Sequence, residues 1–424
     1  MKKRLTACFL SAILIIAILV GCASMGGQAP VTVMQVEVQP LLRPIAGDSA
    51  AQAVAIGAND FAFRLSAMLA EDLGDDNLVV SPYSVWLPLA ALLNATETAK
   101  QDALLGALGA GGISVEDVNR AASRMLFDLT NSGNARRENQ LRIANAMFVA
   151  QERTLRHDFA QRFADYFRGT VMRVDFRSQE AVDAVNQWAY DNTDGLIRDI
   201  IQEFKPETIA AIANAIYFSD RWRSEFRAAD TRQDTFHAPR GAGDAYFMHR
   251  EGLMSYFEDD TLQAVRLPFI YGGGLYILLP RTDSAAALLS DMTAEYFAYI
   301  HSNSYETPGK LLLPRFSIES ELPDLPRTLI ALGVPLFDGG IVGLIYEDQD
   351  LWLGDAVQKA VIEVDERGTT AAAVTVMEIS EEGPPPSPFP PFEMICDRPF
   401  VFVLYQTTVD GGAQVLFTGV VNQP

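Results

Sequence analysis

The sequence predicts an α+β protein, because helical patterns come mostly first along the chain and strand-like patterns mostly later. This order favours antiparallel or mixed sheets over a doubly wound parallel sheet. Apolar residues recur at helical spacing from residue 58 to 69 and in four later stretches, 98–107, 114–131, 157–167 and 179–193. Strand-like runs cover residues 208–218, 263–269, 275–279, 310–318, 357–364, 400–406 and 414–421.

The first elements carry boundary signals of their own. Phe61 and Leu65 lie one helical turn apart on an apolar face. A short strand then ends at Ser81, which we expect to cap the next helix, and Pro82 suits the first helical position because no backbone N–H is needed there. Pro88 lies inside the same helical stretch and predicts a kink or distortion.

Composition excludes several classes of function. The 424-residue chain carries a formal net charge of -21, which argues against nucleic acid as a partner. Its four histidines are far apart, so neither a metal site nor a cofactor is expected. No Gly-x-Ser-x-Gly elbow, phosphate-binding glycine loop or Gly-x-Gly-x-x-Gly occurs. The chain therefore lacks any recognisable arrangement of the nucleophile and base that a hydrolase needs, and we do not expect an enzyme.

The N-terminus has the pattern of an export signal. A basic start is followed by an apolar run over residues 5–20, which is short for a membrane span. The run ends in Leu-Val-Gly-Cys22, which resembles the lipobox of bacterial lipoproteins. The resemblance implies cleavage after residue 21 and lipidation of Cys22, with a weak lean from Ala23 towards the outer membrane over the inner one. An uncleaved membrane anchor is the alternative.

Behind the signal, residues 22–55 predict a flexible tether, because they are rich in glycine and proline and poor in large side chains. A globular domain is expected over residues 56–424. Its one cysteine, Cys396, cannot form a disulfide within the domain, and its strand-like surroundings favour a small buried hydrophobic residue over a nucleophile.

The most informative segment begins at the end of the 357–364 strand. Gly368 permits a bend or an unusual backbone angle. A second strand-competent run of small residues follows it, and a stretch with prolines at 384, 385, 386, 388, 390 and 391 comes next. Such a stretch cannot join a central strand and favours an exposed, extended chain. An ordinary hairpin with a proline-rich tip fits the pattern as well as a specialised loop does.

This segment resembles the reactive-centre hinge of the serpins. The pattern of glutamate, a variable residue, glycine, threonine, a variable residue and a small-residue run is matched in order. The matching residues are Glu366, Arg367, Gly368, Thr369, Thr370, Ala371, Ala372, Ala373, Val374 and Thr375.

Further landmarks of the same family occur in order along residues 56–424. Stretches starting at residues 77, 214, 313, 398 and 416 match the family's second helix and several of its strands. The resemblance implies helices around three β-sheets, a large central mixed sheet and an exposed reactive-centre loop at about residues 366–392.

The resemblance also implies the sites that control opening of the central sheet. A buried polar cluster is expected from Ser81, Ser84, Asn214 and Gln358, the last standing where the family usually has histidine. Trp222 corresponds to a family tryptophan at the end of a central strand. Arg315 is expected to pair with Glu366 in an exposed ion pair at the top of the sheet. The family's glycine-rich motif after the second helix is absent at residues 94–99.

The implied activity is suicide inhibition of serine proteases, with cysteine proteases as an alternative target. The loop acts as bait, and after cleavage its hinge side inserts into the central sheet as a strand. Counting from the hinge places the cut between Glu382 and Gly383, which suits a glutamate-preferring protease. The bonds after residues 379 and 386 are alternatives.

The two resemblances imply two partners: a target protease and, through the lipid, a membrane. The 115–129 helix carries only two bases among three acids, so no heparin-like activator is expected. A monomer is expected. The rival interpretation is a non-inhibitory surface-binding or adhesion lipoprotein on the same fold.

Overall fold

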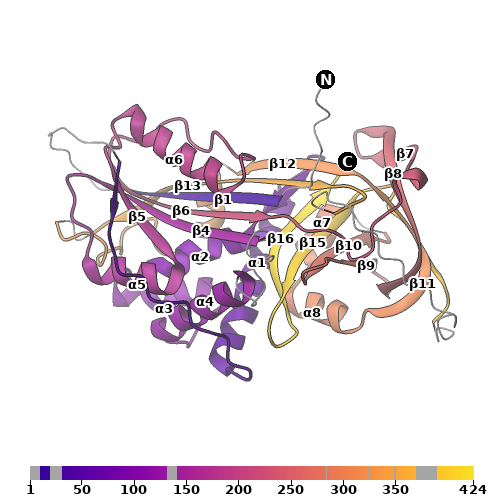
Figure 1. Cartoon of the computed structure of the whole chain (residues 1–424), viewed down its shortest axis with the longest axis horizontal. Coiled ribbons are helices and arrows are strands. Elements are labelled where there is room, and N and C mark those ends of the chain that lie inside the picture. Colours follow the sequence, from indigo (N-terminus) through magenta and orange to yellow (C-terminus); the bar gives the residue numbers. More distant parts are fainter. Residues whose placement is uncertain are drawn as a thin grey trace.

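The structure is a computed structural model, and it describes residues 10–19, 31–130, 141–282, 284–322, 324–347, 350–368 and 389–424. For residues 10–19 it describes the backbone. Helices lie mostly below the large sheet in the view of Figure 1, and α6 lies above it. The helices are α1 Ser49–Glu71, α2 Pro82–Leu92, α3 Thr98–Ala107, α4 Val115–Thr130, α5 His157–Phe167, α6 Gln179–Asn192, α7 Ala285–Asp291, α8 Ala294–Ser302 and α9 Leu325–Ala331.

The helix predictions from residue 98 to 193 are confirmed to within one residue at each end. One local prediction needs correction. Ser81 occupies the N-cap position of α2, but its side chain makes no capping bond, because its hydroxyl has partners elsewhere. Pro88 lies inside α2, which continues to Leu92, and the kink expected there stays a prediction. Every residue of α2 is buried, so tertiary packing offsets the backbone bond that proline cannot donate.

A seven-stranded mixed sheet crosses the molecule (Figure 1) in the order β12-β13-β1-β6-β4-β5-β2. The strand at residues 208–218 is buried on both faces, and the one at 352–364 largely alternates between buried and half-buried residues, as strands of a central sheet do. The strands are β1 Leu10–Leu19, β2 Thr32–Met34, β4 Leu141–Ala150, β5 Gly169–Val174, β6 Thr208–Phe218, β12 Phe316–Leu322 and β13 Trp352–Val364.

The remaining strands form a second sheet in the order β14-β11-β8-β9-β10-β15-β16-β3, with β7 paired to β8. Three sheets were expected, whereas the described strands form two. The reason is the 18-residue β8, which pairs with β11 over most of its length and with β9 at its end. The strands are β3 Leu78–Val80, β7 Arg232–Ala238, β8 Gly241–Glu258, β9 Leu262–Pro268, β10 Gly274–Pro280, β11 Tyr305–Pro314, β14 Phe392–Ile395, β15 Phe400–Thr407 and β16 Ala413–Val421.

The chain before residue 56 is more ordered than a flexible tether. Helix α1 begins at Ser49, β2 pairs with β5, and Leu41 is buried against the body. The amide of Leu42 donates to Ser123 Oγ at 2.9 Å. The packed body therefore starts well before residue 56, the predicted start of the domain. A protein truncated at that residue would lose the first turns of α1.

Candidate functional site: the hinge and the strand position beside it

The hinge follows the end of β13 and lies against the segment that leaves β6. The amide of Trp222 donates to the carbonyl of Arg367 at 3.1 Å, and that of Phe226 donates to the carbonyl of Glu366 at 2.9 Å. The indole N–H of Trp222 donates to the carbonyl of Asp365 at 2.9 Å. Three consecutive hinge carbonyls thus have donors on one neighbouring segment, and these bonds hold the hinge at the end of the central sheet.

Gly368 is required at its position. Its φ is +93°, a left-handed conformation that L side chains rarely adopt. A Cβ there would lie 2.5 Å from the backbone nitrogen of Trp222 and 2.8 Å from Cα of Arg221. Both contacts are with backbone and cannot be relieved by a rotamer change. The glycine therefore allows the chain to turn away from β13 in close contact with the segment behind it.

Glu366 forms the main polar contact of the hinge. Its carboxylate accepts hydrogen bonds from Arg315 Nε at 2.9 and 3.0 Å, from Arg315 Nη2 at 2.5 Å, and from the Thr231 hydroxyl. The expected pair with Arg315 is present but is not exposed at both ends, because the Glu366 side chain is 7% exposed. Burial opposes ionisation, yet the bonds from Arg315 and Thr231 lower the pKa of Glu366 below its usual value. The carboxylate is therefore charged at neutral pH.

The neighbouring acids shift in the other direction. Burial, with a contribution from the charge of Glu366, raises the pKa of Asp365. Burial, with a contribution from Asp365, likewise raises the pKa of Glu363. Asp365 Oδ1 accepts a hydrogen bond from the amide of Arg367 at 2.8 Å. Glu363 and Asp365 therefore hold their protons more tightly than usual, whereas Glu366 holds its proton less tightly.

A strand position next to the hinge lies between β6 and β13. In the structure β1 occupies it and pairs antiparallel with both neighbours over its ten residues. Figure 1 shows β1 lying between β6 and β13 in the middle of the sheet. The end of β1 at Leu10 faces Ile362 and Phe218, close to where the hinge leaves β13. A segment turning back at Gly368 would run in the same direction as β1.

A buried polar cluster lies below this position. Gln358 of β13 forms two bonds with Ser81: the Ser81 amide donates to Oε1 at 3.0 Å, and Nε2 donates to the Ser81 carbonyl at 2.8 Å. The hydroxyl of Ser81 donates to the carbonyl of Leu416 at 3.0 Å and lies 3.0 Å from that of Ser84. All three polar residues are fully buried. The structure therefore brings together three of the four expected members.

Asn214, the fourth expected member, has a different partner. Its Nδ2 donates to Oδ1 of Asn145 on β4 at 2.8 Å, and its own Oδ1 is buried without a partner among the described residues. Asn214 and Gln358 face the same residue of β1 from opposite sides, so β1 separates them. Sequence reasoning missed Asn145, although one asparagine in the apolar run 141–150 was a signal for it.

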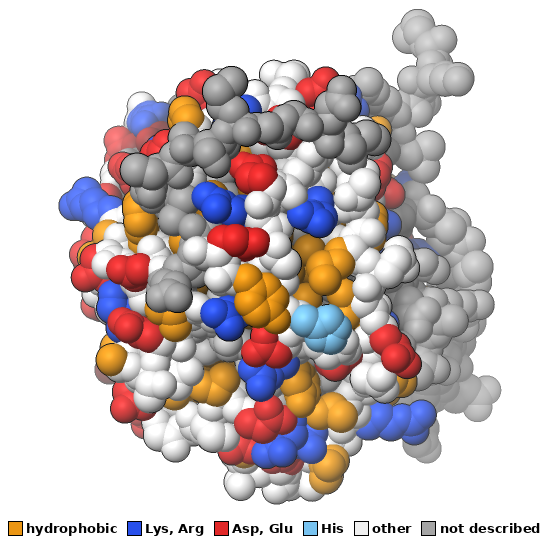
Figure 2. All heavy atoms as spheres, turned by 90° about the vertical axis from the view of Figure 1, so that its left-hand side faces the viewer, with side chains coloured by type: hydrophobic (Ala, Val, Ile, Leu, Met, Phe, Trp, Pro, Cys, Tyr) orange, Lys and Arg blue, Asp and Glu red, His pale blue; other side chains and the backbone are white. Residues whose placement is uncertain are grey.

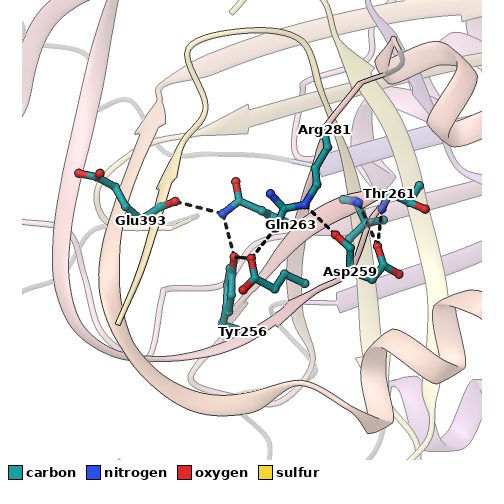
Figure 3. A network of polar contacts seen from close by, with 8 residues as sticks. Tyr256, Asp259, Thr261, Gln263, Arg281 and Glu393 are labelled. Atoms are coloured by element: carbon teal, nitrogen blue, oxygen red, sulfur yellow. Dashed lines mark hydrogen bonds and ion pairs between the residues drawn. The ribbon is translucent and has the colours of Figure 1, made fainter. Parts of the chain in front are cut away.

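The other end of the loop is anchored in the second sheet. Phe392 of β14 stacks on Tyr256 of β8, with ring centroids 3.9 Å apart and an interplanar angle of 3°. Gln263 Nε2 donates to the Glu393 carbonyl at 3.0 Å and to the Tyr256 hydroxyl at 2.8 Å, as Figure 3 shows. Arg281 extends this network to the turn at Asp259. These contacts fix the chain just after the loop.

Several predicted site residues lie outside the described residues. They are Cys22, the hinge residues Thr369, Thr370, Ala371, Ala372, Ala373, Val374 and Thr375, and the bond between Glu382 and Gly383. Cys396 is described: it is free and buried, and burial raises the pKa of its thiol, so it is not an activated nucleophile.

Helix α4 and the face drawn in Figure 2 both carry acidic as well as basic side chains. Figure 2 shows basic side chains interspersed with acidic ones on the face at the left of Figure 1. Both bases of α4 have acidic partners: Arg120 pairs with Asp117 and Arg124 with Asp48. This helix therefore presents no basic stripe.

Comparisons with known proteins agree with this geometry. The family model described as "Serpin (serine protease inhibitor)" matches residues 57–424. An uncharacterized serpin-like protein of Thermococcus kodakarensis is 34% identical over 67% of this chain and 66% of its own length. Plasminogen activator inhibitor 1 of Mus musculus is 28% identical over 87% of this chain and 92% of its own length. The native-state crystal structure of the thermophilic serpin tengpin covers 93% of this chain and 100% of its own, with a TM-score of 0.79 and 23% identity. The chain belongs to the serpin family.

Proposed function

We propose that this serpin is a suicide inhibitor of serine endopeptidases, with the loop at residues 369–391 as bait. The protease serine attacks the carbonyl at the scissile bond, the C–N bond breaks, and the new amine leaves with the β14 side of the loop. The hinge side stays bound to the protease as an ester. It then enters the strand position between β6 and β13 and carries the protease with it.

One observation carries this proposal: the hinge turns at Gly368 beside a strand position that is bounded by β6 and β13. A segment running back from Gly368 would be antiparallel to both neighbours, in the orientation that β1 has. Each inserted residue adds backbone hydrogen bonds worth about 1 kcal/mol each. The far side of the loop is fixed through Phe392 and Glu393. Cleavage therefore frees the hinge side while the β14 side keeps its anchors.

Residues 1–21 have a double role in this proposal. We infer that they are an export signal, that Cys22 is then lipidated, and that the inhibitor is held at a bacterial membrane, preferentially the outer membrane or cell surface. In the structure β1, which belongs to this segment, fills the strand position that the loop needs. Removing the signal would therefore also make the position available.

A second function is favoured by the presence of β1 between β6 and β13. While β1 remains in the sheet, the loop has no strand position to enter, and a cut loop would stay outside. The chain would then be a substrate or a binding protein and not an inhibitor. The glutamate at residue 382 makes glutamate-preferring proteases the first targets to test for either outcome.

The test is to incubate the chain, with residues 1–21 removed, with a panel of serine and cysteine proteases that includes glutamate-specific ones. A band at the summed mass on a denaturing gel, with cleavage located by mass spectrometry near residue 382, is the expected result. Ala373→Arg is the matched control: a charge entering the sheet costs several kcal/mol, so this variant should be cut without forming the complex. Cleavage without a complex across the panel, and without a gain in thermal stability, would overturn the proposal.

A further inference from the structure

Strand β2 lies at the end of the central sheet that is opposite to the hinge. Thr32 of β2 pairs with Arg173 of β5, and the same level of the sheet continues through β4 and β6 to Ile18 of β1. The other end of β1, at Leu10, is the end close to where the hinge leaves β13. Figure 1 shows β5, the partner of β2, towards the left of the long axis, and β11, the partner of β14, at the right.

The segment that forms β2 presents apolar side chains to the outside. Successive side chains of a strand point to opposite faces: Met34 packs against the core, whereas Val31 and Val33 are 37% and 53% exposed. Val33 lies opposite the half-buried Met172 of β5. Val38, further along the same segment, is 51% exposed. Exposed apolar residues are common singly, but three within eight residues of one segment mark a contact surface. We call these three valines the β2 edge.

The β2 edge continues onto the sheet as an apolar strip. Met172 of β5 pairs with Phe148 of β4, which is buried. The ring of Phe148 meets that of Trp188 of α6 edge to face, with centroids 6.3 Å apart. Trp188 is half-buried. Tryptophan is favoured at membrane–water interfaces, because its ring is apolar and its N–H is polar. The strip therefore has the composition of a surface that rests on a bilayer.

Charges at this end of the sheet lie in opposite pairs. Nη2 of Arg177, just after β5, lies 4.0 Å from Oε1 of Glu152, just after β4. Nζ of Lys205, just before β6, lies 3.0 Å from Oδ2 of Asp355 in β13. Figure 2 looks onto this side of the molecule and shows acidic and basic side chains among apolar ones. Paired charges give little attraction to anionic lipids, so contact with a bilayer would come from the apolar side chains.

The lipid of the proposed function would lie close to the β2 edge. Val31 follows Cys22 by nine residues, and nine residues of chain span at most about 32 Å. A few valines are too little apolar surface for stable membrane binding by themselves. A short tether makes the contact intramolecular and so raises the effective concentration of the bilayer at the valines. The anchor would therefore turn a weak apolar contact into a preferred orientation.

We propose that the β2 edge rests on the lipid surface to which the protein is anchored, so that the hinge and β14 lie on the side away from the membrane. The inference depends on the lipidation of Cys22 in the proposed function and adds an orientation to it. One consequence concerns a captured protease. A loop that inserts from Gly368 in the orientation of β1 would end at the level of β2. The protease would thus move from the outward side of the molecule to its membrane side.

Fluorescence quenching on vesicles tests this orientation. The full chain is expressed in a bacterium, purified from its membranes, checked by mass spectrometry for acylation of Cys22, and reconstituted into phosphatidylcholine vesicles that contain a spin-labelled lipid. A fluorescent label is attached at Val33→Cys or, as the matched control, at the exposed Leu253→Cys of β8, beside β11. Cys396 is buried and does not compete for the label. The label at residue 33 should be quenched at least about threefold more strongly, because interfacial side chains enter the headgroup boundary.

A second pair of variants tests the valines themselves, with the label at Val38→Cys. Val31→Asp combined with Val33→Asp keeps the anchor but puts charges on the β2 edge, so quenching at residue 38 should fall by about half or more. Val409→Asp, at a valine that is 57% exposed on the β15–β16 hairpin, is the control and should leave this quenching unchanged.

The outcomes separate the orientation from the anchor. Equal quenching at residues 33 and 253, or unchanged quenching in the double variant, would overturn the orientation while the acylated chain still binds vesicles. A chain that carries no acyl group and does not bind vesicles would overturn the lipid anchor and the orientation together. Quenching at residue 33 that appears only when phosphatidylglycerol is added would also overturn the proposal, because it would show contact through charges and not through the valines.

Discussion

Asn214 of β6 and Gln358 of β13 lie opposite the same residue, Leu14, from the two sides of β1. The two polar residues are therefore level with each other, one strand apart. The Oε1 and Nε2 atoms of Gln358 each bond with the Ser81 backbone, whereas Asn214 Oδ1 has no partner among the described residues. Loss of β1 and closure of β6 on β13 would bring these side chains towards each other. The distance between the Asn214 and Gln358 side chains would therefore distinguish a sheet that contains β1 from one in which β6 pairs directly with β13.

Gly368→Ala tests how tightly the hinge is held. The new Cβ would approach backbone atoms of Arg221 and Trp222, and the residue would have to keep a φ of +93°. We expect a loss of about 1–3 kcal/mol in local stability, seen as faster hydrogen exchange at the amide of Trp222, which donates to the Arg367 carbonyl.

The matched control for this change is Gly111→Ala. Gly111 is exposed, and its nearest heavy atom lies 4.0 Å from the added Cβ. It should leave exchange at Trp222 unchanged. Equal exchange at Trp222 in both variants would show that the hinge is not held by the contacts described.

Gln358→Met tests the buried polar cluster. The substitution keeps the length of the side chain but removes the bonds that Gln358 makes with the amide and the carbonyl of Ser81, which is fully buried. Losing two buried hydrogen bonds should destabilise the fold by about 1–3 kcal/mol in denaturant unfolding.

Gln233→Met serves as the control for the loss of an amide. Gln233 is exposed and its Nε2 donates to the exposed Asp244, so the substitution should change the free energy of unfolding by no more than about 0.5 kcal/mol. A similar small effect for Gln358 would mean that water or a rearranged neighbour replaces its two bonds.

Asp365→Asn tests the acid cluster through its pH dependence. The folded protein raises the pKa of Asp365, chiefly by burial, so the charged form is disfavoured at neutral pH and the penalty disappears as pH falls through the folded pKa. Asparagine removes the charge but keeps an oxygen that can accept from the Arg367 amide. We expect Tm at pH 7 to rise by roughly a degree or two and the gain to vanish towards pH 4.

Glu366→Gln tests the neighbouring acid, whose pKa is shifted in the opposite direction to that of Asp365. Glu366 has a lowered pKa, so its stabilising charge is present above the unfolded pKa and is lost as pH falls through the folded pKa. Glu366→Gln should therefore lower Tm at pH 7 and have little effect in acid. If both variants changed Tm in the same direction at pH 7, the assignment of opposite shifts would be wrong.

The sequence predicted most elements but only part of the site. Residues 208–218 form β6 at the predicted bounds, because a strand buried on both faces reads as one apolar run. Thr231 and Asn145 were not predicted, because their contacts with Glu366 and Asn214 join residues far apart in sequence. The position of β1 could not be predicted either: an apolar run suits an export signal and a buried strand equally, and periodicity does not separate them.

The last prediction concerns β1 itself. Removing residues 1–21 should convert the chain from a form that proteases merely cut into one that forms covalent complexes, because β1 otherwise fills the position between β6 and β13. The measurement is the fraction of protease in the complex band for the two chains at equal concentration. The shorter chain should also gain thermal stability when its loop is cut, whereas the full chain should not.

Two controls separate strand occupancy from other effects of the N-terminus. A full-length variant with Ile13→Pro and Ile15→Pro keeps the segment but removes backbone donors from β1, so it should form complexes like the shorter chain. A synthetic peptide of residues 10–19, added to the shorter chain before the protease, should suppress the complex by refilling the position. Equal complex formation by the full and shorter chains would mean that β1 leaves the sheet at no cost. Complex formation would then be limited only by cleavage of the loop.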